Sequence, residues 1–196
     1  MTDYRSEASV GARIKLARRQ RGYRTTRELA DAIPGGNVTA AILENIESGR
    51  KADISISQLL NIARGLGVPP SMLLAPIGSP DSGLDLPNLS QQFDGMTATQ
   101  FDCWLSATPA SSYKPKLAAE RADIDVLNSL RELGTLRREL ERLRIVLDVQ
   151  SASGDSDLVS SNDDVRDRIE SVTNEAVRVA GLLVSAGISE RSDSAS

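Results

Sequence analysis

Apolar residues in the first 75 positions recur at helical spacing, but only over short stretches. Val10, Ile14 and Ala17 share one face of a helix expected from about 9 to 20. Similar short apolar patterns predict four further helices, at 25–33, at 39–47, from 55 to about 66 and just after 69–70. Five short helices in a row indicate a small all-α domain.

Helix start and stop signals separate these stretches. Thr25 with Glu28, and Ser55 with Gln58, are expected capping boxes, in which each residue of a pair satisfies an unpaired backbone N–H of the other. Thr39 is the expected cap of the third helix. The residues 34–37, Pro-Gly-Gly-Asn, break the chain between the second and third helices.

Leucines in the second half of the chain follow a different period. They step by 3, 4, 3 and 4, which is the pattern of a coiled-coil seam, at Leu133, Leu136, Leu140, Leu143 and Leu147. In a parallel dimer of this register, Glu132 faces Arg137 and Glu139 faces Arg144 of the second chain, so opposite charges meet. The pattern therefore predicts dimerisation through these nine positions.

A second long helix is expected after a polar loop at 151–155. It begins near Asn162 and carries a broad apolar face from Val165 to Ala186, which suits a helical bundle better than a two-stranded seam. We expect it to fold back on the first long helix, either its own or that of a partner. A dimeric four-helix assembly and an intramolecular hairpin in a monomer are both compatible with this pattern.

Proline placement divides the chain into segments. We expect a compact helical domain at 1–75, a connector rich in Pro, Ser and Gly at 76–115, long helices at 116–190 and a disordered tail at 191–196. The connector also holds four of the six aromatic residues: Phe93, Phe101, Trp104 and Tyr113. They are expected to pin the connector to a helix as a small satellite core, with a ligand pocket or a partner-docking segment as the alternative.

Composition excludes several kinds of chemistry. The chain has no His and one Cys, Cys103, so it lacks His-based triads, His/Cys zinc sites and internal disulfides. It also lacks a phosphate-binding GxxxxGK[ST] loop and an apolar run long enough to cross a bilayer. We expect a cytoplasmic protein that is not an enzyme and uses no metal or cofactor.

Charge is unevenly distributed along the chain. Residues 1–75 hold 11 basic and 7 acidic side chains, a net +4, whereas residues 76–196 hold 12 basic and 20 acidic ones, a net −8. A basic first segment can attract phosphate, while the acidic remainder limits non-specific adhesion.

The ordered set of short helices resembles the lambda-repressor-like, or XRE-type, helix-turn-helix family over about residues 6–75. The residues that carry the resemblance are 12–19, 25–32, 41–51 and 59–69. The chain departs from the family pattern in its longer turn at 34–37, in Thr26, and in Ala40 and Ala41, where longer polar side chains are usual. The resemblance implies an all-α, five-helix DNA-binding domain, here followed by a connector and a two-helix coiled-coil or hairpin region.

In this family the second helix of the pair enters the major groove, so the helix at 39–47 is the expected recognition helix. The base-reading candidates on and before it are Asn37, Thr39, Ala40, Ala41, Glu44 and Asn45. Asn can pair with adenine, Glu can accept from cytosine, and Ala can contact the thymine methyl. The phosphate-binding candidates are Thr25, Thr26, Arg27, Arg50, Lys51 and Arg13, with Arg18 or Arg19 as a weaker choice.

The sequence thus predicts a homodimeric, sequence-specific transcriptional regulator, a repressor by resemblance, whose partner is double-stranded DNA with a palindromic operator. The alternative is a protein-interaction module, such as an antitoxin, whose C-terminal helices bind a protein partner.

Overall fold

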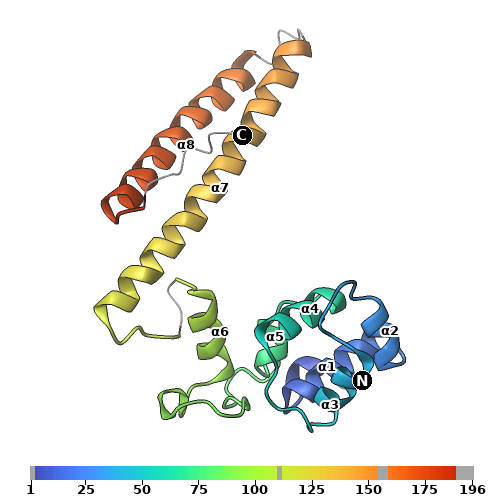
Figure 1. Ribbon diagram of the computed structural model, residues 1–196. Coiled ribbons are helices and arrows are strands. Elements are labelled where there is room, and N and C mark those ends of the chain that lie inside the picture. Colours follow the sequence, from blue (N-terminus) through green and yellow to red (C-terminus); the bar gives the residue numbers. More distant parts are fainter. Residues whose placement is uncertain (1–2, 110–111, 154–158, 189–196) are drawn as a thin grey trace. The chain divides into compact units, whose positions relative to one another are not determined.

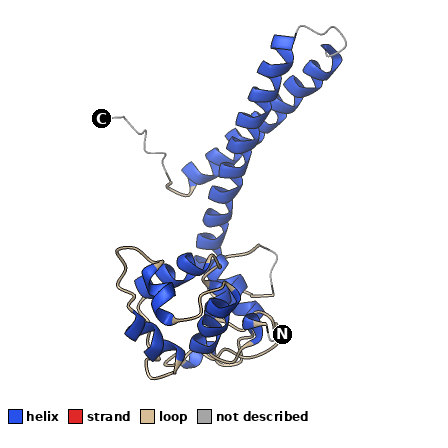
Figure 2. Cartoon of the chain, turned by 90° about the vertical axis from the view of Figure 1, so that its right-hand side faces the viewer, coloured by secondary structure: helices blue, strands red, loops and turns tan. Residues whose placement is uncertain are grey.

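The computed structural model describes residues 3–109, 112–153 and 159–188. In this part of the chain the regular elements are helices, and the one β-type contact is an isolated bridge between Gly83 and Thr97 (Figure 2). The protein is therefore all-α. The chain divides into two compact units, Met1–Lys114 and Pro115–Ser196. The tail expected to be disordered, 191–196, lies outside the described residues.

Six helices make up the first 75 residues of the first unit (Figure 1). They are η1 (Tyr4–Ser6), α1 (Val10–Gln20), α2 (Thr26–Asp31), α3 (Ala40–Glu47), α4 (Ile56–Leu66) and α5 (Ser71–Leu74). The Ser55–Gln58 capping box is present at the start of α4. At α2 the cap differs from the prediction, because Glu28 accepts from the N–H of Arg24 at 2.7 Å instead of from Thr25.

The core of these helices is aliphatic. Ile14, Leu29, Leu43, Ile62 and Leu73 are fully buried and come from α1 through α5. Each such side chain contributes roughly 2 kcal/mol through removal from water. Gly11 permits the close approach of α1 to α3, because a Cβ there would collide with the carbonyl oxygen of Ile46.

Arg13 is part of this core and not part of a surface. Its side chain is fully buried, and its guanidinium forms a two-pronged ion pair with Asp85 at 2.7 and 2.8 Å. It also donates to the carbonyl oxygens of Glu7, Leu73 and Leu74. The expectation that Arg13 contacts DNA phosphate is corrected by this geometry, because its donors are already used inside the protein.

Residues 76–109 are more structured than the expected connector. They form a 3-10 turn, η2 (Gln91–Phe93), and a helix, α6 (Ala98–Ser106), which begins with a complete capping box between Thr97 and Gln100. Phe101 is buried beside Phe93, whose ring also makes an edge contact with Trp104 at 5.5 Å. The expected aromatic satellite core is confirmed for Phe93 and Phe101, whereas Trp104 is exposed and touches it from outside.

Two long helices, α7 (Ala118–Ser153) and α8 (Val159–Ser185), make up the second unit and lie side by side (Figures 1 and 2). Both extend further than predicted: α7 continues through the first three residues of the expected loop, and α8 begins before Asn162. The rest of that loop, 154–155, lies outside the described residues. Leu133, Val179 and Leu183 form the buried contact between the helices.

None of the described helices combines the length and the apolar character needed to cross a membrane.

Candidate nucleic-acid interface

The helix α3 has one buried face and one exposed face. Leu43 and Ile46 are buried in the core, whereas Ala41, Glu44 and Asn45 are exposed on the other side. The Thr39 hydroxyl caps the helix by accepting from the N–H of Ile42 at 3.3 Å. The structure thus brings three of the base-reading candidates onto one outward face, while Ala40 is half-buried.

A buried ion pair fixes α3 against α1. Arg18 donates to both carboxylate oxygens of Glu47 at 2.7 Å, with the two side chains only 5% and 6% exposed. Its remaining donors bind the carbonyl oxygens of Tyr23 and Arg24, in the turn before α2. The hydrogen bonds that Arg18 donates to Glu47 raise the pKa of Arg18 above its usual value, although burial opposes this. Arg18 thereby positions α2 and α3 and is not a phosphate contact.

The start of α2 reaches the exposed face of α3. The Thr26 hydroxyl donates to the carboxylate of Glu44 at 3.3 Å. Thr25 is exposed and caps α2, with its hydroxyl accepting from the N–H of Glu28 at 3.2 Å. The expected phosphate-binding and base-reading residues therefore meet at this edge.

The turn before α3 is held by α4. The Asn37 amide donates to the Ser57 hydroxyl at 2.7 Å and accepts from Asn61 at 3.2 Å, while Gln58 donates to the Asn37 carbonyl at 3.1 Å. Both the nitrogen and the oxygen of the Asn37 side-chain amide are hydrogen-bonded to α4. Asn37 therefore holds the turn before α3 against α4, and these bonds compete with contact to a base. The sequence reasoning missed these three α4 residues, although the predicted helix start at Ser55 had placed them on its first turns.

Exposed cations flank the outward face of α3. Arg27 on α2 and Arg50 after α3 are exposed, whereas Lys51 is half-buried and donates to Gln58 at 2.9 Å. Arg24, immediately before α2, is also exposed and was not among the predicted contacts. Exposed arginines thus lie before and within α2 and after the end of α3.

The leucine seam on α7 is used within the chain. Leu133 and Leu140 are buried, and Leu133 contacts Val179 and Leu183 of α8. Leu136, Leu143 and Leu147 are half-buried. The seam expected to bind a second chain is therefore covered in large part by α8 of the same chain.

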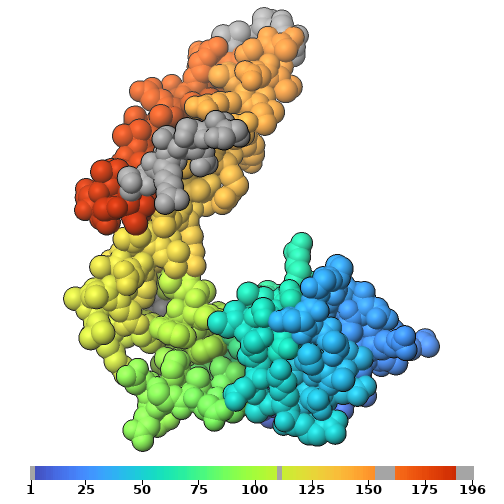
Figure 3. Space-filling view, viewed as in Figure 1, coloured from blue at the N-terminus to red at the C-terminus, as the bar shows by residue number. Residues whose placement is uncertain are grey.

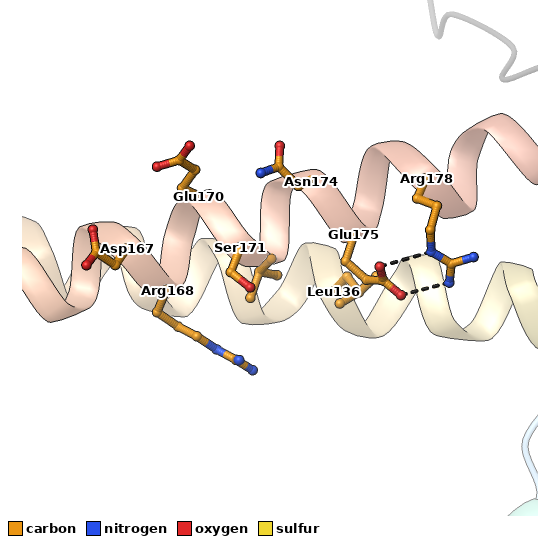
Figure 4. A pocket seen from close by; sticks show the side chains of 9 residues that line it. Leu136, Asp167, Arg168, Glu170, Ser171, Asn174, Glu175 and Arg178 are labelled. Atoms are coloured by element: carbon orange, nitrogen blue, oxygen red, sulfur yellow. Dashed lines mark hydrogen bonds and ion pairs between the residues drawn. The ribbon is translucent and has the colours of Figure 1, made fainter.

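One acidic residue of the predicted charge pairs also has a partner within the chain. Glu139 pairs with Arg168 of α8 at 2.7 Å. Arg178 of α8 is hydrogen-bonded to Glu175, which raises its pKa, and the nearby charge of Glu132 raises it further. Figure 4 shows the Glu175–Arg178 pair beside Leu136, on a strongly polar side of the helix pair. The remaining predicted partners, Arg137 and Arg144, are exposed.

Within the described residues, no group of three or more Cys, Asp or Glu side chains is arranged to hold a metal ion. In comparisons with known proteins, no protein-family model, curated protein or solved structure matches this chain.

Proposed function

We propose that the first 75 residues bind double-stranded DNA in a sequence-specific manner, as the reader of a dimeric transcriptional regulator. One observation carries this proposal: α3 buries Leu43 and Ile46 and presents Ala41, Glu44 and Asn45 outward, with the exposed cations Arg24, Arg27 and Arg50 around it. A helix presented in this way has the diameter of the major groove. The resemblance of residues 6–75 to the lambda-repressor-like family favours repression of a palindromic operator.

Each exposed group has a role in this proposal. Asn45 pairs with adenine through its amide, and Ala41 contacts the methyl group of thymine. Glu44 accepts from the amino group of cytosine and repels phosphate, so it penalises a misplaced helix. Arg27 and Arg50 bind the two phosphate backbones at the groove edges.

The test is fluorescence anisotropy of the full chain on a labelled duplex from upstream of its own gene and on a scrambled duplex, at two salt concentrations. Specific binding is expected to be roughly 10³-fold or more tighter than binding to the scramble. Equal and weak binding to both duplexes contradicts the proposal, because a basic surface alone explains it.

Two substitutions separate the proposed roles. Arg50→Ala is expected to weaken binding to both duplexes and to lower the salt slope by about 1. Asn45→Ala is expected to lose about 1–3 kcal/mol on the specific duplex and little on the scramble. Arg64→Ala, an exposed cation on α4, is the matched control for Arg50→Ala. An equal loss on both duplexes for Asn45→Ala removes its base-reading role.

A further inference from the structure

The C-terminal half of α8 is apolar well beyond the face that packs on α7. Val179 and Leu183 are buried against α7, but Val177 and Val184 on another side are 67% and 65% exposed. They line a groove of about 720 Å³ between the two helices, together with Leu130, Gly134, Ala176 and Ala180. A helix that is apolar on more than one side is normally covered on each of them.

Charge is confined to the opposite side of α8. Between residues 173 and 188 the charged side chains are Glu175 and Arg178. They pair with each other at 2.7 Å and line the polar side shown in Figure 4, not the apolar groove. The outward stripe of α8 itself therefore carries no charge that would repel an identical helix, and among the described residues the one charged side chain that lines the groove is Arg137 of α7.

Two glycines in the helix interiors have no packing role inside the chain. A Cβ at Gly181 meets nothing within 4 Å, and a Cβ at Gly134 meets only the end of the Arg138 side chain at 3.7 Å. Glycine lowers the stability of a helix interior relative to alanine, so close approach of another backbone is the usual reason for its presence. Space beside these glycines is open for a helix from outside the chain.

The apolar stripe is symmetric about the Ala180–Gly181 peptide bond. Outward positions of α8 fall at Thr173, Val177, Ala180, Gly181 and Val184, and on either side of that bond Val177 and Val184 are equally spaced, as are Ala180 and Gly181. When two identical helices pack antiparallel about a two-fold axis at this point, Val177 meets Val184 of the second copy twice. The smallest residues meet at the axis, where the backbones come closest. A two-fold interface requires this kind of self-complementarity.

From these observations we infer that the apolar groove of α7 and α8 binds a second copy of this chain, with the two α8 helices antiparallel and crossing at Ala180–Gly181. The surface follows α8 from Thr173 to Ser185 for about 18 Å and is about two helix diameters, or 20 Å, wide. Two copies then bury on the order of 700 Å² in total, which is in the range of weak and concentration-dependent interfaces. The residues 189–196 are rich in Ser and charge, so they cannot supply the apolar side chains that the groove needs.

This inference rests on the proposed function only for its purpose, the pairing of two DNA-binding units. Sedimentation of the full chain without DNA, between about 1 and 100 µM, tests it directly. A monomer–dimer equilibrium is expected for the natural chain. The double variant Val177→Asp/Val184→Asp is expected to raise the dissociation constant of the dimer at least about 30-fold. Both valines are exposed, so the variant retains the helical circular dichroism of the natural chain.

The matched control places the same charges on the polar side of the same helix. Ser171→Asp/Asn174→Asp is expected to leave the dissociation constant unchanged within about 2-fold. A chain that is monomeric at about 100 µM overturns the inference, and so does equal dimerisation of both double variants.

Cysteine cross-linking tests the orientation, in a Cys103→Ser background. Gly181→Cys, near the axis, and the pair Val177→Cys/Val184→Cys are expected to form disulfide-linked dimers, whereas Val177→Cys alone is not. Cross-linking of Val177→Cys alone indicates parallel helices and overturns the antiparallel arrangement.

These results are separable from those on DNA. A dimer that binds no specific duplex leaves this inference standing and removes the proposed function. Specific DNA binding by a strictly monomeric chain supports DNA recognition by the first 75 residues and removes this inference.

Discussion

Two arginines of the basic residues 1–75 are buried and form ion pairs that connect separate parts of the fold. Arg18 joins α1 to Glu47 of α3, and Arg13 joins α1 to Asp85 in the segment after α5. A buried ion pair adds little net stability compared with apolar packing, but removal of one partner leaves a charge without compensation. The two pairs therefore fix the geometry of unit 1 more than its stability.

Glu47→Ala tests this at the most buried pair. The substitution leaves the Arg18 guanidinium uncompensated, with its partner's site only 6% exposed, and is expected to destabilise unit 1 by about 3–5 kcal/mol. Urea unfolding followed by Trp104 fluorescence measures the loss. The matched control is Asp31→Ala, which breaks the exposed Arg27–Asp31 pair at 3.9 Å and is expected to cost less than about 0.5 kcal/mol. Similar losses for the two variants contradict this account.

The burial of these arginines is partly visible in the sequence. Val10, Arg13, Ile14, Ala17 and Arg18 follow the spacing of one helix face, so both arginines share the apolar side of α1. Charge alone predicts a surface position for Arg13, whereas this spacing predicts a buried one. The identity of the buried acceptors could not be predicted, because Asp85 is 72 residues away from Arg13 in the chain.

At the scale of elements, α6 shows how a local signal can be overlooked in a segment rich in proline. Thr97 and Gln100 form a capping box of the same kind as Ser55 and Gln58. The segment from 76 to 115 was nevertheless expected to be a connector, since five prolines and several glycines dominate it. Phe101 and Phe93 belong to one apolar cluster because α6 presents Phe101 toward Phe93.

Thr97→Ala is expected to destabilise α6 by about 1 kcal/mol, because the N–H of Gln100 loses its acceptor. Trp104 lies on α6 and is the single tryptophan, so its fluorescence reports the loss in thermal or urea unfolding. Thr135→Ala on α7 serves as the control and leaves the Trp104 transition unchanged. If Thr97→Ala leaves the Trp104 unfolding transition unchanged, the cap does not stabilise α6.

The two long helices illustrate what a heptad pattern can and cannot specify. Leucines at Leu133 and Leu140 predict a helical partner, and the structure supplies α8 of the same chain. Nothing in the spacing distinguishes this from a helix of a second chain. The charge pattern did not distinguish them either, since Glu139 pairs with Arg168 of α8, whereas the heptad register matches it with Arg144 of a second chain. The two helices pack on each other, and Figure 3 shows them adjacent where neither is covered.

Leu133→Ala tests the α7–α8 contact. Leu133 is 5% exposed, and its truncation is expected to destabilise unit 2 by about 2–4 kcal/mol through lost burial and a cavity. The loss is measured by thermal unfolding of the helical circular dichroism, while the Trp104 signal of unit 1 stays unchanged. Val149→Ala, at an exposed position of the same helix, is the control and is expected to cost less than about 0.5 kcal/mol. A comparable shift for both variants contradicts the assignment of Leu133 to the buried contact.

At the scale of the whole molecule, charge and apolar surface are assigned to different units. The basic residues 1–75 carry the proposed reader, and the acidic second unit carries the apolar groove. In the proposed function a single reader of this size covers few base pairs, so we expect specificity to depend on a second reader at a spacing of about 34 Å, one turn of DNA. A weak dimer is sufficient for this purpose, because a first bound reader raises the effective concentration of the second.

This coupling predicts a selective loss of affinity in the double variant Val177→Asp/Val184→Asp. On the specific duplex the variant is expected to bind at least about 10²-fold more weakly than the natural chain, because its two readers bind independently. On the scrambled duplex the affinities are expected to differ much less, since single readers dominate there. Anisotropy titrations at one salt concentration measure both. A duplex that holds only one half-site is the control, and on it the two proteins are expected to bind equally. Equal binding on the full site contradicts the coupling, even where the variant sediments as a monomer.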